Sequence, residues 1–349
     1  MKNNTLSIAS VIAPSSVLAA YRWLCRRRRH FPPDADIWHF RIHAHTLIPT
    51  LLDQLRHGTY TFQPVQLIEK TDGQTIAVWS SADALVIKLL ADALRLILPV
   101  HPCCEHVAGH GGGKTSAQKL DRQIRSGQFH FVLRTDIQGY YAQINKHTLL
   151  AQLAVYIDCP ILMNLLGQFL FYSVERGGVF HTPKLGISRG SALSPLLAAF
   201  HLYALDKEFA DRQGSDWSYA RYMDDFVILT RTRWQLRRAV RRLKQWFQHF
   251  GFRFHPEKTY IGKIDRLDKQ AKLDWMGYAF NGKGLCGIAP RALNNHLDTQ
   301  RRLYEQARKK GHPWDTLLTR VRQYQKRWIH AFQFTVLYTP LRYGCFFRC

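Results

Sequence analysis

The chain has 349 residues, of which 46% are hydrophobic and 13% aromatic, a composition typical of a globular protein and not of a disordered one. It carries 49 lysines and arginines against 25 acidic residues, a formal net charge of +24. Such an excess favours a polyanionic partner, and the aromatic content favours nucleic acid over a membrane. The seven cysteines have no disulfide-framework spacing, which indicates a reduced, cytoplasmic protein.

Two apolar stretches could be mistaken for export or membrane signals. The first, Met1–Ala20, is interrupted by proline and serines and runs into Arg26–Arg29, so we expect a short segment leading into a basic helix. The second, Ala84–Val100, carries polar residues at helical spacing, which predicts an amphipathic helix: Lys88, Asp92 and Arg95. We therefore expect no membrane association.

Residues 31–130 alternate helical and extended patterns. Reading periodicity and turn residues in chain order gives the following expectations: a helix at Ile37–Gly58, an extended segment at Thr59–Glu69, a turn at Asp72-Gly73, a strand at Thr75–Trp79 and a helix at Ala84–Leu98.

Two motifs in the next stretch match known functional motifs poorly. Residues 101–106 hold cysteine and histidine, but adjacent cysteines beside a proline fit the spacing of a zinc site poorly. Residues 109–115 end like a phosphate-binding loop, yet Ala108 stands where that motif needs glycine. We expect a glycine-rich turn packed near bound nucleic acid.

Two acidic positions stand out because strands lead to them. Phe129–Asp136 is a predicted strand that ends in a carboxylate, which is costly in a core unless it is paired or binds a metal. Ser218–Leu229 is a predicted hairpin whose tight turn holds Asp224 and Asp225. A tight turn can present such oxygens to a divalent cation, although a solvated acidic turn is the plain alternative.

Helical patterns dominate the remainder of the chain. A loop at Gly186–Pro195 leads into an apolar helix at Leu196–Ala210, and Trp234–Phe250 forms an amphipathic helix whose basic face suits solvent and nucleic acid equally. From Pro290 onward two further helical patterns carry basic residues on their outer faces: Arg301, Arg302, Arg308, Lys309, Lys310, Arg320, Arg322, Lys326 and Arg327.

Five stretches in this order resemble the motifs of reverse transcriptases, the group II intron type in particular. They are Asp136-Ile137-Gln138-Gly139-Tyr140-Tyr141 for motif A, Gly186–Pro195 for motif B, Tyr222-Met223-Asp224-Asp225 for motif C, Gly251–Thr259 for motif D and Asp274–Tyr278 for motif E. The chain departs from the usual pattern where Arg189 replaces a glutamine and where Gln74-Thr75-Ile76 lacks an arginine.

This resemblance implies an α+β fold with the right-hand architecture of polymerases. The N-terminal segment and fingers would take residues 1–130, and the palm, an antiparallel sheet backed by helices, residues 131–285, with a fingers return around 145–187. A helical thumb would take residues 286–349.

The same resemblance implies roles for individual residues. Asp136, Asp224 and Asp225 would bind two Mg²⁺ ions together with Ile137, and Lys258 would serve as the acid for the leaving pyrophosphate. Lys70, Tyr141, Arg189 and Gly190 would contact the nucleotide, and Tyr141 would close the pocket against a ribose 2′-hydroxyl. Trp275, Met276 and Gly277 would form the primer grip, and the thumb would hold nucleic acid through Arg301, Arg302, Arg308, Lys309, Arg320 and Lys326.

The implied activity is RNA-directed DNA polymerisation from dNTPs on a primer. No maturase, endonuclease or integrase module follows the thumb pattern, and no Val-Thr-Gly of the retron kind stands near the C-terminal end. By elimination the chain resembles short bacterial defence-associated reverse transcriptases, such as class 2, which copy a structured non-coding RNA into cDNA. A group II intron-derived, retron-like or diversity-generating enzyme, an RNA-templated RNA polymerase and a non-catalytic RNA-binding protein are the alternatives.

Overall fold

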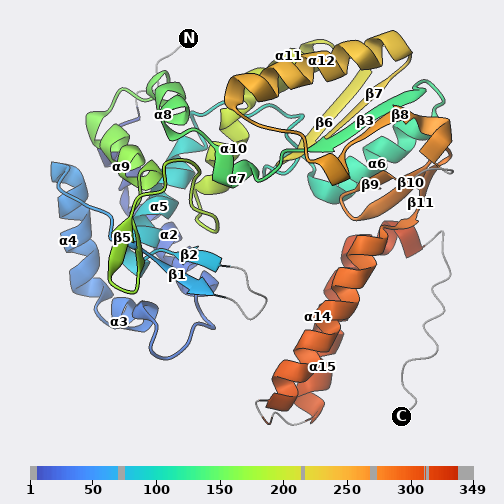
Figure 1. Cartoon of the computed structure of the whole chain (residues 1–349). Helices are drawn as coiled ribbons and strands as arrows, with labels where there is room; N and C mark the ends of the chain where they lie inside the picture. Colours follow the sequence, from blue (N-terminus) through green and yellow to red (C-terminus); the bar gives the residue numbers. More distant parts are fainter. Residues whose placement is uncertain are drawn as a thin grey trace. The chain divides into compact units, whose positions relative to one another are not determined.

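The computed structural model describes residues 6–69, 75–213, 217–267, 273–309, 311 and 314–336 (Figure 1). The chain divides into two compact units, each built from separated segments. The first unit takes residues 1–101, 137–208 and 244–253, and the second takes residues 102–136, 209–243 and 254–349. Both units therefore draw on the predicted palm, whose bounds stay a prediction.

The first unit is mainly helical and carries one small sheet. Its elements are α1 (Ile8–Val11), α2 (Pro14–Arg27), α3 (Asp36–Ile42), α4 (Ala44–His57), β1 (Val65–Glu69), β2 (Thr75–Val78), α5 (Ser81–Leu94), α7 (Tyr140–Gln143), α8 (Lys146–Ala154), α9 (Pro160–Leu170), β4 (Val174–Arg176), β5 (Val179–His181) and α10 (Ser194–His201). Helix α11 (Tyr203–Asp211) and helix α12 (Arg233–Phe250) contribute residues to both units.

The sheet of the first unit has the strand order β2-β1-β4-β5, with β1 parallel to β4 and the other pairs antiparallel.

Buried Arg28, directly after α2, connects the end of that helix to the start of α5 and to α3. Its guanidinium donates to the Ser81 hydroxyl at 2.8 Å and to the Trp79 carbonyl at 2.7 Å, and pairs with Asp36 at 3.2 Å. These bonds offset the cost of removing a guanidinium from water.

The second unit is built on two antiparallel sheets. Its elements are α6 (Gly112–Arg125), β3 (Phe131–Asp136), β6 (Trp217–Tyr222), β7 (Asp225–Thr230), η1 (Pro256–Lys258), β8 (Tyr260–Lys263), η2 (Ile264–Arg266), β9 (Leu273–Trp275), β10 (Tyr278–Asn281), β11 (Gly284–Ile288), α14 (Pro290–Lys309) and α15 (Trp314–Val336). The larger sheet has the order β6-β7-β3-β8, and the smaller has the order β11-β10-β9.

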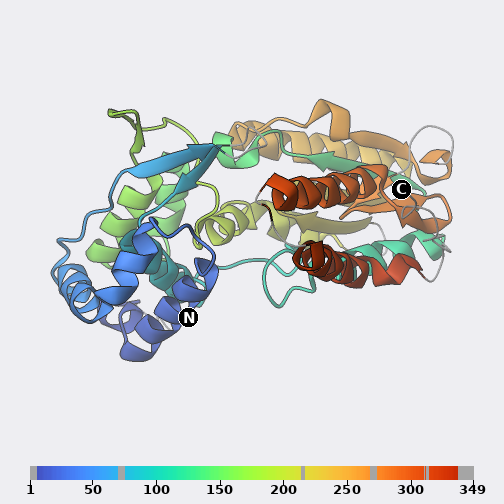
Figure 2. The ribbon, with the colours of Figure 1, turned by 90° about the horizontal axis from the view of Figure 1, so that it is seen from below.

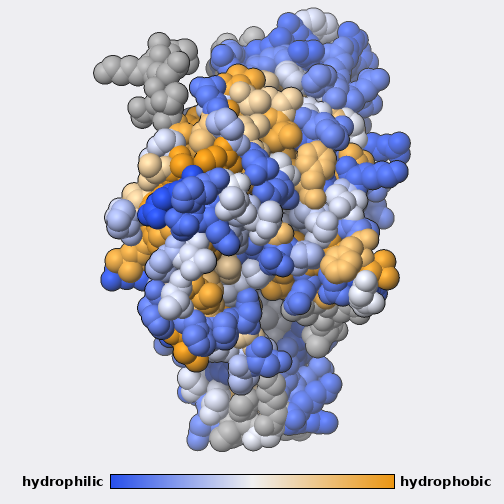
Figure 3. All heavy atoms as spheres, turned by 90° about the vertical axis from the view of Figure 1, so that its left-hand side faces the viewer, coloured by the Kyte–Doolittle hydropathy of each residue, from blue (hydrophilic) through white to orange (hydrophobic). Residues whose placement is uncertain are grey.

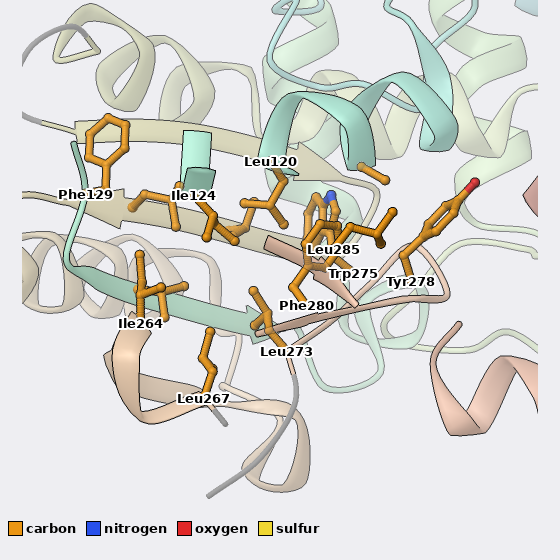
Figure 4. Packing of buried hydrophobic residues seen from close by; sticks show 14 of the residues in the cluster. Leu120, Ile124, Phe129, Ile264, Leu267, Leu273, Trp275, Tyr278, Phe280 and Leu285 are labelled. Carbon is orange, nitrogen blue, oxygen red and sulfur yellow. The ribbon is translucent and has the colours of Figure 1, made fainter. Parts of the chain in front are cut away.

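A hydrophobic core joins these two sheets to α6 (Figure 4). Strand residues alternate between the two faces, so Val132, Val227 and Leu229 reach this core. Leu120 and Ile124 of α6 and Trp275, Phe280 and Leu285 of the small sheet fill the remainder. The larger sheet is thereby fixed against α6, while Figure 1 shows α12 along its other face.

Helices α14 and α15 lie side by side (Figures 1 and 2). His296 of α14 stacks on Trp328 of α15, with ring centroids 3.9 Å apart. Phe332, further along α15, packs on Tyr278 of β10 at 5.0 Å. This helical pair is therefore anchored on the small sheet.

No helix in the described part of the chain is long and apolar enough to cross a membrane. In α5, the polar stripe expected from the sequence includes an ion pair between Lys88 and Asp92 at 2.6 Å. On the face drawn in Figure 3, orange hydrophobic residues form small groups among blue hydrophilic residues.

Candidate active site

Three carboxylates meet at one end of the larger sheet. Asp136 ends β3 and Asp225 begins β7, and the antiparallel register places these two residues directly opposite each other. Asp224 comes from the tight turn that joins β6 to β7. Oxygens of the three side chains lie within 4.8 Å of one another, and this is the one such group found among the described residues.

The turn that carries Asp224 has an uncommon backbone conformation. Met223 has a φ of 55°, in the left-handed region that non-glycine residues rarely adopt. Its carbonyl accepts a hydrogen bond from the guanidinium of Arg221 at 2.8 Å, and its N–H donates to Nδ1 of His106 at 3.1 Å. Both backbone polar groups of Met223 are thus held by side chains.

The segment before α6 supports this turn from outside the hairpin. Cys104 forms a parallel bridge with Arg221, and the N–H of Glu105 donates to the Arg221 carbonyl at 2.8 Å. The Arg221 N–H in turn donates to the Cys103 carbonyl at 2.9 Å. The cysteine and histidine stretch that resembled a poor zinc motif therefore holds the hairpin in place.

Two basic side chains contact the carboxylates. Arg134, two residues before Asp136 on β3, pairs with Asp225 at 2.8 Å and donates to the Lys258 carbonyl at 2.6 Å. Lys258 in η1 pairs with Asp136 at 2.7 Å. Asp136 is 4% exposed, so the ion pair with Lys258 stabilises a carboxylate that is almost removed from water.

Burial raises the pKa of Asp225 to about 7. The neighbouring carboxylates of Asp136 and Asp224 contribute to this rise, while Arg134 and Lys258 oppose it. Three acids so close together repel one another when ionised, and a bound divalent cation would remove that penalty. Carboxylate oxygens are the ligands that Mg²⁺ prefers, so the residues present fit the predicted ion.

Three of the four residues predicted for the nucleotide pocket, Tyr141, Arg189 and Gly190, are described and belong to the first unit. The Arg189 guanidinium lies 5.7 Å from the centroid of the Tyr141 ring. The N–H of Ile187 donates to the Tyr141 carbonyl at 2.9 Å. Gly186 approaches so closely that an added Cβ would stand 2.8 Å from the Tyr141 carbonyl oxygen. Arg189 and Gly190 are exposed beside this contact, so residues of motifs A and B meet here.

The predicted primer grip forms the turn between β9 and β10. Met276 has a φ of 54° and Gly277 a φ of 80°, and buried Trp275 donates its indole N–H to Ser116 at 2.8 Å. Gly113 lies against Met276, because a Cβ added there would be 3.6 Å from the Met276 Cβ. The glycine-rich segment expected near bound nucleic acid thus packs on the predicted primer grip.

The other predicted positions are distributed as follows. Ile137 is fully buried directly after Asp136, and its role as a metal ligand stays a prediction. Lys70 lies outside the described residues. The six basic thumb residues are all exposed on the last two helices: Arg301, Arg302, Arg308 and Lys309 on α14, and Arg320 and Lys326 on α15.

Sequence reasoning assigned no role to Arg134, His106 and Arg221. Arg134 and Asp136 share a face of one strand, and that spacing could have suggested an arginine beside the carboxylates. His106 contacts the Met223 turn, and Arg221 contacts the segment before α6, across long separations in sequence. No local sequence pattern predicts these contacts.

An antiparallel sheet that collects three carboxylates at one end, backed by helices, has the arrangement of a polymerase palm. The chain belongs to the reverse transcriptase family, because the family model described as "Reverse transcriptase (RNA-dependent DNA polymerase)" matches residues 77–280.

Two of the curated relatives are named as intron proteins. The group II intron-encoded protein LtrA of Lactococcus lactis subsp. cremoris is 28% identical over 169 residues, which cover 46% of this chain and 28% of LtrA. The putative COX1/OXI3 intron 1 protein of Saccharomyces cerevisiae is 21% identical over 220 residues, which cover 60% of this chain and 26% of that protein. The matches thus span little more than a quarter of either relative.

Among solved structures, the apo telomerase of Candida tropicalis truncated from its C-terminal domain matches with a TM-score of 0.48 and 16% identity. That match covers 65% of this chain and 54% of the telomerase chain.

Proposed function

We propose that this protein is an RNA-directed DNA polymerase that extends a primer with dNTPs by two-metal catalysis. The observation that carries the proposal is the cluster of Asp136, Asp224 and Asp225, whose oxygens lie within 4.8 Å of one another in a chain of the reverse transcriptase family. These are the positions at which the motif resemblance puts the catalytic acids.

Each residue near the cluster has a proposed task. Two Mg²⁺ held by the three aspartates and the Ile137 carbonyl would lower the pKa of the primer 3′-hydroxyl and offset charge on the phosphate oxygens. Arg134 orients Asp225 through their 2.8 Å ion pair. Lys258, which pairs with Asp136 at 2.7 Å, would donate a proton to the leaving pyrophosphate.

Outside the carboxylate cluster, the proposal gives the nucleotide and the duplex separate contacts. Lys70, Tyr141, Arg189 and Gly190 bind the incoming dNTP, and the ring of Tyr141 excludes a 2′-hydroxyl. The turn at Trp275, Met276 and Gly277 positions the primer end. The basic thumb residues hold duplex phosphates, with an affinity that falls as salt rises.

We further propose that the template is a dedicated structured non-coding RNA, copied into cDNA in the bacterial cytoplasm as part of antiphage defence. The net charge of +24 supports a large RNA partner. The LtrA relative supports a group II intron-derived enzyme as the second candidate.

The test compares three purified proteins from the same host. They are the wild type, the double variant Asp224→Ala/Asp225→Ala, and the control Asp158→Asn, which changes an exposed carboxylate of the first unit. Co-purifying RNA is sequenced, and DNA made after addition of Mg²⁺ and dNTPs is sequenced alongside it.

We expect wild type and control to make cDNA that maps to one bound RNA, and the double variant to bind that RNA without making DNA. If all three bind RNA and none extends any primer, the protein is a non-catalytic RNA-binding protein. If cDNA maps to an intron containing the gene, the group II intron-derived alternative replaces the defence role.

A further inference from the structure

A groove lies in the second unit where β6 and α12 begin. It has a volume of about 350 Å³ and is lined by Arg212, Trp217, Thr232, Trp234, Gln235 and Arg238. In the β6–β7 hairpin, Trp217 pairs with Thr230, whereas Tyr222 pairs with Asp225. Since β6 has six residues, the groove stands about 17 Å along the hairpin from the carboxylates. It is therefore separate from the candidate active site.

Aromatic rings and guanidinium groups line this groove together. Trp234 is 65% exposed, although it is one of the largest apolar side chains. The Arg238 guanidinium lies 5.5 Å from the Trp234 ring centroid, and the Arg212 guanidinium lies 5.9 Å from that of Trp217. An exposed indole beside arginine is a platform on which a flat ring can stack.

The polar groups of the groove are mainly hydrogen-bond donors. Trp217 is 4% exposed, and its buried indole N–H has no acceptor among the described residues. The acceptor oxygens of Thr232 and Gln235 are occupied by each other's backbone N–H groups, at 3.2 Å and 2.9 Å, in a capping box that begins α12. A ligand would have to bring acceptors and negative charge.

The helix next to the groove strengthens that requirement. Helix α12 contains no acidic residue, and its exposed face carries Arg233, Arg237, Arg238 and Arg241. Such a surface attracts a polyanion over a distance of about a Debye length, near 8 Å in physiological salt. The sequence alone left this face undecided between solvent and nucleic acid.

We propose that the groove is a second RNA-binding site, which takes an unpaired nucleotide of a single-stranded RNA segment outside the polymerising site. The base stacks on Trp234, and Arg212 and Arg238 hold the flanking phosphates. This proposal rests on the proposed function only in naming RNA as the partner. It would let the protein hold a structured RNA while another part of that RNA is copied.

The experiment first fills the polymerising site of the full chain with poly(rA)–oligo(dT). It then measures binding of a fluorescein-labelled oligocytidylate, which pairs with neither strand, by anisotropy at several salt concentrations. The variants are Trp234→Ala, Trp234→Phe and Arg238→Gln, and the control is Arg56→Gln, an exposed arginine of α4. Incorporation of dTTP on the same primer–template is measured in parallel, and an oligocytidylate carrying one 4-thiouridine is photo-crosslinked to the wild type.

We expect Trp234→Ala to weaken oligocytidylate binding between about fivefold and a hundredfold, because stacking of one base is lost. Trp234→Phe should recover most of that loss, since a phenyl ring also stacks. Arg238→Gln should lower the salt slope by about 0.7, the contribution of one single-strand phosphate contact. The crosslink should map to residues 233–241, and dTTP incorporation should match the control.

Equal affinities of wild type and Trp234→Ala would overturn the proposal, as would a crosslink only elsewhere; both results are expected if the groove takes an acidic protein. Loss of dTTP incorporation together with oligocytidylate binding would also overturn it, because the groove would then belong to the polymerising path. A wild type that extends no primer, here or on its co-purifying RNA, would refute the proposed function, while the oligocytidylate comparison would still decide whether the groove binds RNA.

Discussion

The hydrogen bond from the Met223 N–H to His106 should be needed to position the turn that carries Asp224. Replacing His106 with alanine removes the acceptor of the Met223 N–H and leaves a partly buried donor unpaired. Such a loss costs about 1–2 kcal/mol at a partly buried site. The left-handed conformation of Met223 adds about 1 kcal/mol of strain, so the turn has little reserve against rearrangement.

If the ~1–2 kcal/mol lost at the turn is added to the activation free energy through a misplaced Asp224, the rate of nucleotide addition falls about fivefold to thirtyfold. The assay is single-turnover extension of oligo(dT) on poly(rA) across a range of dTTP concentrations. We expect the maximal rate to fall while the dTTP dissociation constant stays within about twofold, because His106 touches the turn and not the predicted nucleotide pocket.

Two further variants make the prediction refutable. His106→Asn should restore most of the rate, since an amide oxygen can accept the same N–H. His110→Ala is the matched control, because His110 bonds the Cys104 carbonyl at 3.0 Å in the same segment without contacting Met223. Equal losses in His106→Ala and His110→Ala, or no recovery in His106→Asn, would show that the turn is not positioned by this hydrogen bond.

Three more outcomes follow from the first unit. Tyr141→Ala should raise ribonucleotide incorporation relative to dNTPs, and an unchanged ratio in competition extension would remove its proposed steric role. Gly186→Ala should lower the melting temperature more than Gly178→Ala. Both glycines have φ near 84°, but only a Cβ at position 186 would stand 2.8 Å from a carbonyl oxygen. Equal shifts in melting temperature would contradict this steric explanation. Burial lowers the pKa of Lys146 to about 8, and its Nζ has no hydrogen-bond partner among the described residues. Between about pH 8 and 10 the unfolded chain therefore binds more protons than the folded one, so the wild type gains stability as the pH rises through that window. At pH 7 we expect Lys146→Met to be more stable than the wild type by up to about 3 kcal/mol. Denaturant titrations should show this difference in the free energy of unfolding shrinking toward pH 10.

The sequence predicted those elements whose signals are local. The amphipathic pattern at Trp234–Phe250 is confirmed as α12 (Arg233–Phe250), and the strand before Asp136 is confirmed as β3. The hairpin around Asp224 is confirmed as β6 and β7. In each case hydrophobic periodicity and a turn or stop residue agree over the same few positions.

The predicted lengths of two helices were wrong. Leu196–Ala210 was expected as one helix, but α10 ends at His201 and α11 begins at Tyr203. The amide of Gln152 donates to the His201 carbonyl at 3.3 Å and its oxygen contacts the His201 ring at 2.6 Å. A partner on another helix thus takes a carbonyl that a continuous helix would use.

The expected helix at Ile37–Gly58 also divides, into α3 and α4, with His43 between them. His43 caps both helices: its N–H donates to the His39 carbonyl at 3.1 Å as the end of α3, and its carbonyl accepts from the Leu47 N–H at 2.9 Å as the start of α4. The three aspartates were predicted to converge only through the motif resemblance. Arg134 and Lys258 were not predicted to pair with them, since these contacts depend on the register of β3 with its neighbours.

The segmented construction of the second unit has a consequence for its synthesis. The central strand β3 is made early, but its partners β7 and β8 belong to segments that leave the ribosome much later. Strand pairing over such separations is slow, because the intervening chain must be closed into a loop first. The nascent chain therefore has no assembled carboxylate cluster until Asp225 has been translated and paired with Asp136. Unfinished chains consequently lack the carboxylate cluster at which we propose that nucleotides are added.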